Sequence, residues 1–164
     1  MSAPFGAAQP RQLPVLEWLR LAVGATLLTL ATACSAADET RAILHTATGD
    51  YPFTIEIADD SAEHAKGLMF RDTLAPDAGM LFDYGREREV SFWMQNTLIP
   101  LDMIFIGGDG VVKSIHVNAR PLDTTPIPSG APVQFVLEIP GGRSAEIGLA
   151  PGDRLENLRV GKTF

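Results

Sequence analysis

Hydrophobic and polar residues alternate along much of the chain after residue 40, and the period of the alternation differs between segments. In YPFTIEIA, residues 51–58, Phe53, Ile55 and Ile57 alternate with polar residues, and a period of two is typical of a half-buried β-strand. The stretch AILHTATG before it has the composition of a strand, and Gly49-Asp50 between them is a hairpin-like turn signal. We therefore predict that the domain begins with two neighbouring strands.

The segment DDSAEHAKGLMFRD, residues 59–72, changes to the period of a helix. Four of its apolar residues share one helical face: Ala62, Ala65, Leu68 and Met69. Asp60 and its neighbours can cap the first N–H groups of this helix. A glycine inside a helix costs up to ~1 kcal/mol relative to alanine, so we explain Gly67 by a close approach of another backbone segment.

Further short apolar segments predict more strands: MLFDYG, the segment around Trp93, LDMIFI, VVKSIHV, VQFVLEI and RLENLRV. Gly107 to Gly110 form the strongest hairpin signal, and Ala119 to Pro132 hold four prolines and are expected to be a surface loop. GGRSAEIGLAPGD suggests one or two helical turns. Because hairpin links dominate, we predict an α+β domain with a mostly antiparallel, strongly curled or barrel-like sheet and one main helix.

The first 37 residues have a different pattern. Arg11 and Arg20 precede an apolar run from Leu21 to Ala33, which is shorter than the ~20 residues that a membrane-spanning helix needs. This run has the length of the apolar part of a secretory signal, and Ala31-Thr32-Ala33 fits the cleavage pattern. We therefore expect residues 1–37 to be a leader with a short tether and residues 38–164 to be a single globular domain. An uncleaved N-terminal membrane anchor is the alternative.

The single cysteine, Cys34, directly follows the apolar run. TLATAC resembles a bacterial lipoprotein signal, in which the cysteine is lipidated and becomes the first residue, although Ala31 stands where that motif usually has leucine. Ser35 resembles the outer-membrane sorting pattern of Gram-negative lipoproteins. We expect an exported protein that is held in the periplasm or at the outer membrane through a lipid on Cys34. Ordinary cleavage and release as a soluble protein is the alternative.

Charge and residue spacing exclude several classes of function. The net charge is −7 and no basic run exists, which argues against a nucleic-acid partner. His45, His64 and His116 stand far apart and no second cysteine is present, so we expect no metal site and no cofactor. No serine lies in a Gly-x-Ser-x-Gly elbow, and we assign no catalytic residue.

The most unusual stretch is FWMQNTLIPLDMIFIGGDG, residues 92–110. Alternation places Phe92 and Met94 towards the core and Trp93 on the opposite side of the strand. A tryptophan at a partly open surface is a frequent binding anchor. The alternative is that the helix or the proline-rich loop covers it.

Asp102 lies within the apolar strand LDMIFI, on the same side as Ile104 and Ile106. Burying this charge without partners would cost several kcal/mol, so it needs donors, which Arg71, Asn96, Thr97 and nearby backbone N–H groups can supply. One interpretation is a structural aspartate that fixes the turn. The other places Asp102 at the floor of a pocket with Trp93 and Asn96 on its wall.

Four motifs together resemble the domain of unknown function 192 family. They follow in order over about a hundred residues, from Ile55 to roughly Leu158: GLMFR (67–71), GMLF (79–82), FWMQNTLIPLDMIFI (92–106) and VLEIPGG (136–142). The resemblance implies a small, sheet-rich domain that often follows a signal or lipoprotein leader in bacteria, with no established activity and no catalytic roles to carry over. Members often have a cysteine pair in the proline-rich segment, whereas PLDTTPIPSGAP has none, which removes any disulfide or metal role for this loop.

Three functions follow from these expectations. The first is a non-catalytic envelope domain that binds a small molecule or an envelope protein through Arg71, Trp93, Asn96, Thr97 and Asp102. The second is a hydrolase of cell-envelope substrates that uses Asp102 with Glu138, because both carboxylates lie in apolar strands. The third is an assembly component without a ligand.

Overall fold

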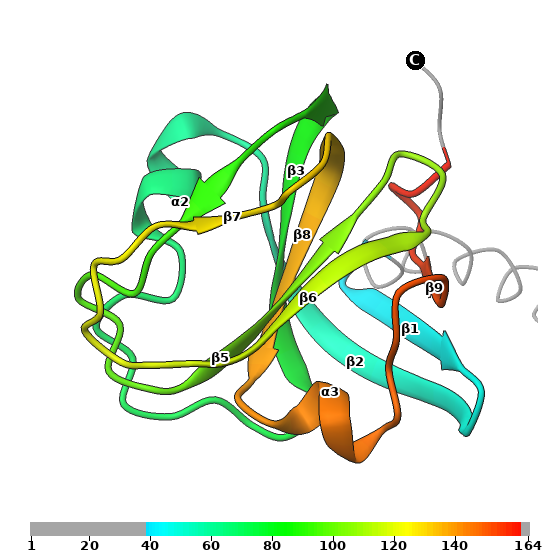
Figure 1. The fold of residues 1–164 in the computed structure, drawn as a ribbon, viewed down its shortest axis with the longest axis horizontal. Helices are drawn as coiled ribbons and strands as arrows, with labels where there is room; N and C mark the ends of the chain where they lie inside the picture. The colour runs from blue at the N-terminus through cyan, green and yellow to red at the C-terminus, as the bar shows by residue number, and fades with distance from the viewer. Residues whose placement is uncertain (1–38, 162–164) are drawn as a thin grey trace, which may run out of the picture. The chain divides into compact units, whose positions relative to one another are not determined.

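The computed structural model describes residues 39–161, so the expected leader and Cys34 lie outside the described residues (Figure 1). This part of the chain contains nine strands and two short helices. In chain order they are β1 (Arg41–Thr46), β2 (Gly49–Ala58), α2 (Ser61–Lys66), β3 (Ala78–Arg88), β4 (Ser91–Phe92), β5 (Leu101–Ile106), β6 (Val112–Ala119), β7 (Ile127–Pro128), β8 (Val133–Pro140), α3 (Arg143–Glu146) and β9 (Arg154–Glu156). None of the helices described is long and apolar enough to span a membrane.

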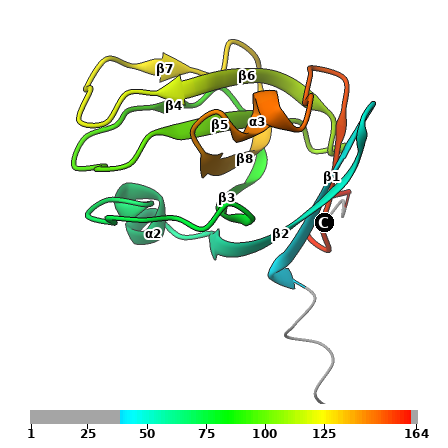
Figure 2. The same ribbon diagram turned by 90° about the horizontal axis from the view of Figure 1, so that it is seen from below.

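Seven strands form one sheet in the order β6-β5-β8-β3-β2-β1-β9. Only the β2–β3 pair is parallel among these pairings. The sheet curls until its two edge strands meet at one end, where the N–H of Val112 donates to the carbonyl of Asp153 at 2.9 Å and the N–H of Leu155 donates to Gly110 at 2.8 Å (Figure 2). The prediction of a mostly antiparallel, strongly curled sheet is therefore confirmed.

The prediction of one main helix is wrong, because α2 and α3 are both very short. The Asp60 carboxylate caps α2 as expected and accepts from the N–H groups of Ala62 and Glu63 at 2.8 Å. Gly67 then ends the helix with a φ of 45°, and no residue of α2 is buried. A Cβ on Gly67 would lie 3.1 Å from Phe82 Cζ. Gly67 therefore does have a close neighbour, but this neighbour is an aromatic side chain and not the backbone segment that we expected. The domain is β-rich.

The central strands are buried on both faces, and all six residues of β5 are buried. One hydrophobic cluster lies inside the curl and includes residues from seven strands, among them Leu44, Phe53, Ile104 and Phe135. The second cluster lies on the other face, around Phe82, Met94, Met103 and Phe105. It includes residues of the segments that cover this face.

These covering segments are the connections that follow α2, β3 and β6. The strand expected around Trp93 is reduced to Ser91 and Phe92, which pair with Pro128 and Ile127 in a small second sheet. The proline-rich segment is therefore more than a surface loop, because Ile127 is buried in the second cluster. Together these segments build the surroundings of Trp93.

Candidate functional site

The turn after Trp93 holds two other loops in place. The carbonyl of Asn96 accepts from the N–H of Phe70 at 2.8 Å, and the carbonyl of Thr97 accepts from the N–H of Leu122 at 3.1 Å. Asn96 itself has a φ of 57°, a left-handed conformation that asparagine tolerates better than most residues. Three segments far apart in sequence thus meet at one end of the domain.

Trp93 is 52% exposed at this end, while the next residue, Met94, is fully buried. This is the arrangement that the alternation of residues predicts, although only two residues of the segment are in a strand. The indole is therefore accessible, and the segments around it do not enclose it. A half-exposed tryptophan on an ordered turn can contact a ligand at little cost in conformational freedom.

A small cavity of about 80 Å³ opens beside Trp93. Residues of α2, β3, β4, β8 and the turn contribute to its wall, including His64, Tyr84, Phe92, Trp93, Thr97 and Glu138. Two of the predicted binding residues, Trp93 and Thr97, therefore line one cavity. Asn96 is exposed on the adjoining turn, where its Nδ2 lies 3.8 Å from Met69 Sδ.

Glu138 carries the strongest chemical signal in this cavity. Its side chain is 5% exposed, and in the sheet it lies opposite Met80 on β3 and Met103 on β5. Among the described residues no group donates a hydrogen bond to its carboxyl. Burial raises the pKa of Glu138 to about 8, so the group is mainly a neutral acid at neutral pH. A buried carboxyl without a protein partner is unusual and is typical of functional sites.

Tyr84 and His64 form the side of the cavity next to Glu138. Their ring centroids are 4.5 Å apart, and His64 Nε2 donates to the carbonyl of Ala58 at 2.9 Å. Burial raises the pKa of the Tyr84 hydroxyl to about 12. The Arg88 guanidinium, 4.6 Å from the ring centroid, lowers this pKa, and the charge of Glu138 raises it further. The hydroxyl therefore stays protonated and remains a hydrogen-bond donor.

Asp102 does not lie in this cavity. It is fully buried and accepts from the backbone N–H groups of Asn118, Gly142 and Ser144 at 2.6, 2.8 and 2.8 Å, and from Ser144 Oγ at 2.5 Å. The expectation that Arg71, Asn96 or Thr97 would satisfy this carboxylate is wrong. Asp102 instead ties β6 to the start of α3, which is a structural role.

Arg71 is also occupied elsewhere. Its guanidinium binds both carboxylate oxygens of Glu56, at 2.5 and 2.6 Å. The Arg71 hydrogen bond is the largest effect on Glu56 and lowers the pKa of that carboxyl. Arg71 therefore fixes the segment after α2 to β2 and is not among the residues that line the cavity.

Asp102 and Glu138 lie on opposite faces of the sheet. Asp102 is paired with Ile139, and Glu138 is paired with Met103, and neighbouring residues of a strand point to opposite sides. Asp102 therefore faces the cluster inside the curl, while Glu138 faces the cavity beside Trp93. The two carboxyl groups cannot open to one cleft, which removes the geometric basis of the two-carboxylate hydrolase.

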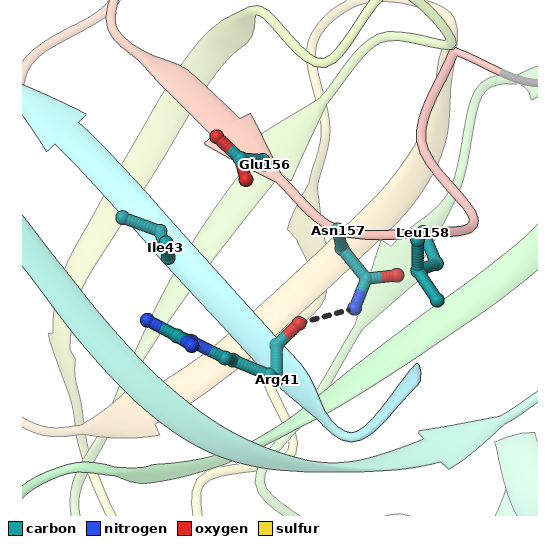
Figure 3. A pocket seen from close by; sticks show the side chains of 5 residues that line it. All are labelled: Arg41, Ile43, Glu156, Asn157 and Leu158. Atoms are coloured by element: carbon teal, nitrogen blue, oxygen red, sulfur yellow. Dashed lines mark hydrogen bonds between the residues drawn. The ribbon is translucent and has the colours of Figure 1, made fainter. Parts of the chain in front are cut away.

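A larger hollow of about 310 Å³ lies between β1 and β9 (Figure 3). Its polar groups serve the fold, because Asn157 Nδ2 donates to the carbonyl of Arg41 at 2.7 Å and to that of Glu39 at 2.9 Å. It contains no buried titratable group without a partner. We therefore place the candidate site at the smaller cavity, despite the difference in volume.

Metal ligands do not cluster in the part of the chain that the structure describes. No three side chains of His, Cys, Asp or Glu lie close enough to hold a metal ion within residues 39–161. The three histidines lie on β1, α2 and β6. The candidate site therefore offers a carboxyl, hydroxyls and aromatic rings as its chemistry.

Sequence reasoning missed two residues of the cavity and gave a third the wrong partner. Glu138 stands out in the sequence as an acid within VLEI, but the pattern suggested that it acts as a pair with Asp102. Tyr84 could have been found by alternation, because Met80, Phe82 and Tyr84 fall on one side of the strand MLFDYG. His64 gave no such signal, since a histidine on an exposed helix is ordinary.

Comparisons with known proteins place this site in a family. A search of curated proteins found no match. A crystal structure from Sinorhizobium meliloti 1021, described as a proposed transcription regulator, is 47% identical, with a TM-score of 0.71 over 73% of this chain and 93% of that chain. A protein of unknown function from Novosphingobium aromaticivorans DSM 12444 is 46% identical, with a TM-score of 0.69 over 71% of this chain and 83% of that chain.

The family comparison covers most of the described domain. The model of the family described as "Uncharacterized ACR" matches residues 43–157. These residues include the cavity beside Trp93 and all four motifs noted in the sequence. The chain belongs to the domain of unknown function 192 family.

Proposed function

We propose that this protein is an exported, lipid-anchored envelope domain that binds a small ligand in the cavity beside Trp93. One observation carries the proposal: the Glu138 carboxyl is buried, has no hydrogen-bond partner among the described residues, and lines a cavity beside a half-exposed tryptophan. A ligand that fills the cavity can hydrogen-bond to this carboxyl and contact the indole. Asp102 and Arg71 have no part in this binding.

The energetics of Glu138 support a ligand more than a purely structural role. Removing a carboxyl from bulk water is costly, and an apolar residue between Met80 and Met103 would avoid this cost. A ligand that supplies the missing partner recovers part of it on binding. Asp102 gives the contrast, because all its hydrogen bonds come from the protein itself.

Binding is tested by a fragment screen that follows the indole resonance of Trp93 in two-dimensional NMR. The resonance is assigned by comparison with Trp93→Phe. We expect fragments that shift it also to shift the backbone resonance of Thr97, and to bind more weakly by this second signal to Trp93→Ala but equally well to Leu158→Ala, which removes an exposed apolar residue at the other hollow. A screen in which no fragment selects Trp93 over Leu158 would contradict small-ligand binding here.

Export and lipid attachment rest on the leader, residues 1–37, and on Cys34. Mass spectrometry of the mature protein is the direct test. We expect a chain that begins at Cys34 and carries acyl groups, and we expect Cys34→Ser to abolish the acyl groups and release the domain from the membrane fraction. A mature chain that begins elsewhere without acyl groups would support ordinary secretion instead.

A second candidate function is general acid–base catalysis by Glu138 alone. The observation in its favour is that the pKa of this carboxyl is about 8, close to the range in which proton transfer at neutral pH is most effective. The two candidates separate by turnover: conversion of a bound ligand by the wild type that stops in Glu138→Gln supports catalysis, whereas a ligand that binds and is recovered unchanged supports binding alone. The role named for the Sinorhizobium meliloti protein is not transferred, because a net charge of −7 opposes binding to nucleic acid.

A further inference from the structure

The cavity beside Trp93 is rich in aromatic rings and hydrogen-bond acceptors. Phe82, Tyr84, Phe92 and Trp93 line it. Phe82 and Phe92 pack edge to face with centroids 5.1 Å apart, which fixes the orientation of the Phe92 ring. The carboxyl of Glu138 is the one acid among these lining residues.

Cationic donors are scarce in the same wall. No arginine lines the cavity, and His64 Nε2 already donates to the carbonyl of Ala58. Lys66 is the one ammonium group among the lining residues, and it is exposed and interacts electrostatically with Glu56. An anionic ligand would therefore keep the Glu138 carboxyl protonated, whereas a cation is stabilised by its ionised form.

We propose that the cavity binds a small organic ammonium ion, held by the carboxylate of Glu138 and by the rings of Phe92 and Trp93. Aromatic faces attract cations, and the gain reaches about 2 kcal/mol where the cation leaves water. A carboxylate beside aromatic rings offers a cation both a counter-charge and π-faces. This inference rests on the proposed function and names the class of its ligand.

Large apolar side chains are exposed on the segments that carry lining residues of the cavity. Phe70 follows the lining residue Met69, and Leu98 follows the lining residue Thr97. Leu122 is hydrogen-bonded to Thr97 through its backbone. All three side chains are large, apolar and exposed, so these segments offer apolar surface to a ligand that extends beyond the cavity.

Binding of a permanent cation should displace the proton of Glu138 into solvent. The charged or titratable groups around this carboxyl are His64 and Lys66 near α2 and Tyr84 on β3, with Arg88 stacked on the Tyr84 ring. The neighbours on the flanking strands, Met80 and Met103, do not titrate. Below the pKa of Glu138, each lower pH unit should therefore weaken binding by about tenfold.

The test compares choline with 3,3-dimethyl-1-butanol, a neutral molecule of nearly the same shape. Isothermal titration calorimetry of the full chain in a non-ionic detergent measures both affinities between about pH 6 and pH 9. We expect choline to bind at least tenfold more tightly than the alcohol above pH 8, with the pH dependence stated above for choline only. Glu138→Gln should reduce choline affinity at least tenfold and remove its pH dependence, while binding of the alcohol is retained.

Glu89→Gln is the matched control, because it removes one exposed acid outside the cavity and should leave both affinities unchanged. Thermal unfolding checks that each variant is folded. Equal affinity for choline and the alcohol, or choline binding that survives Glu138→Gln, overturns the ammonium proposal but leaves a ligand cavity in place. If neither probe nor any fragment acts on Trp93, the proposed function fails as well.

Discussion

Replacing Glu138 with glutamine should change how the stability of the domain depends on pH. Burial raises the pKa of this carboxyl from 4.5 to about 8. Below the lower value the carboxyl is protonated in both the folded and the unfolded chain, and its ionisation has no effect on stability. Between the two values the unfolded chain loses the proton and the folded chain keeps it, so the free energy of unfolding falls as pH rises.

The size of this effect follows from the two pKa values. One pH unit corresponds to about 1.4 kcal/mol while the two states differ by one proton. Between about pH 5 and pH 9 the wild-type domain should lose on the order of 4 kcal/mol through Glu138. Glutamine has nearly the same shape and does not titrate, so Glu138→Gln should gain stability over wild type by that amount across the same range.

Urea unfolding followed by circular dichroism at several pH values measures this difference. All other titrating groups are common to the two proteins, so they cancel when one curve is subtracted from the other. Glu89→Gln, which removes one exposed acid outside the cavity, serves as the control for the loss of a carboxylate. A flat difference curve for Glu138→Gln would refute the conclusion that this carboxyl is buried without a partner.

Three further substitutions test the framework around the site, each by urea unfolding. Asp102→Ala leaves three backbone N–H groups without their acceptor and should lower the free energy of unfolding by about 3–5 kcal/mol. Ser144→Ala should lower it by only about 1 kcal/mol. Similar losses in the two variants would contradict the central role of Asp102. Gly79→Ala would place a Cβ 2.5 Å from the carbonyl oxygen of Glu138 and should cost about 2 kcal/mol or more; full stability would show that β3 and β8 can separate. Asn96→Ala should cost about 1 kcal/mol because of the φ of 57°, and Asn96→Gly should cost less; the opposite order would assign the role to the side chain.

Local patterns in the sequence predicted the sheet well. Alternation in YPFTIEIA gives most of β2, and the glycines of residues 107–110 give the β5–β6 hairpin. The turn expected at Gly49-Asp50 is wrong, because both residues already pair with β1. Alternation also predicted the outward direction of Trp93 and the burial of Met94. These features depend on near neighbours in the chain, which is why a single sequence reveals them.

Features that depend on distant parts of the chain could not be predicted in this way. The helical face from Ala62 to Met69 suggested a longer helix, but Gly67 ends it and Leu68 is buried after the helix rather than on it. The donors to Asp102 come from β6 and α3, up to 42 residues away. Sequence alone also did not show that Glu138 and Asp102 lie on opposite faces of the sheet, because this follows from the register between β5 and β8.

The end of the domain around Trp93 combines several features that lower the stability of the protein. Phe70 and Leu122 have φ angles of 62° and 63°, and a bulky residue in this conformation costs about 1–2 kcal/mol. Both side chains are also exposed, at 67% and 59%, so they gain little from burial in return.

Glu138 adds the cost of a buried carboxyl without a partner at the same end. Hydrogen bonds to the turn at Asn96 and Thr97 hold both strained residues, and Thr97 also lines the cavity. Each of these features is unfavourable for an isolated domain, and a ligand that hydrogen-bonds to Glu138 in the cavity would offset the cost of burying that carboxyl.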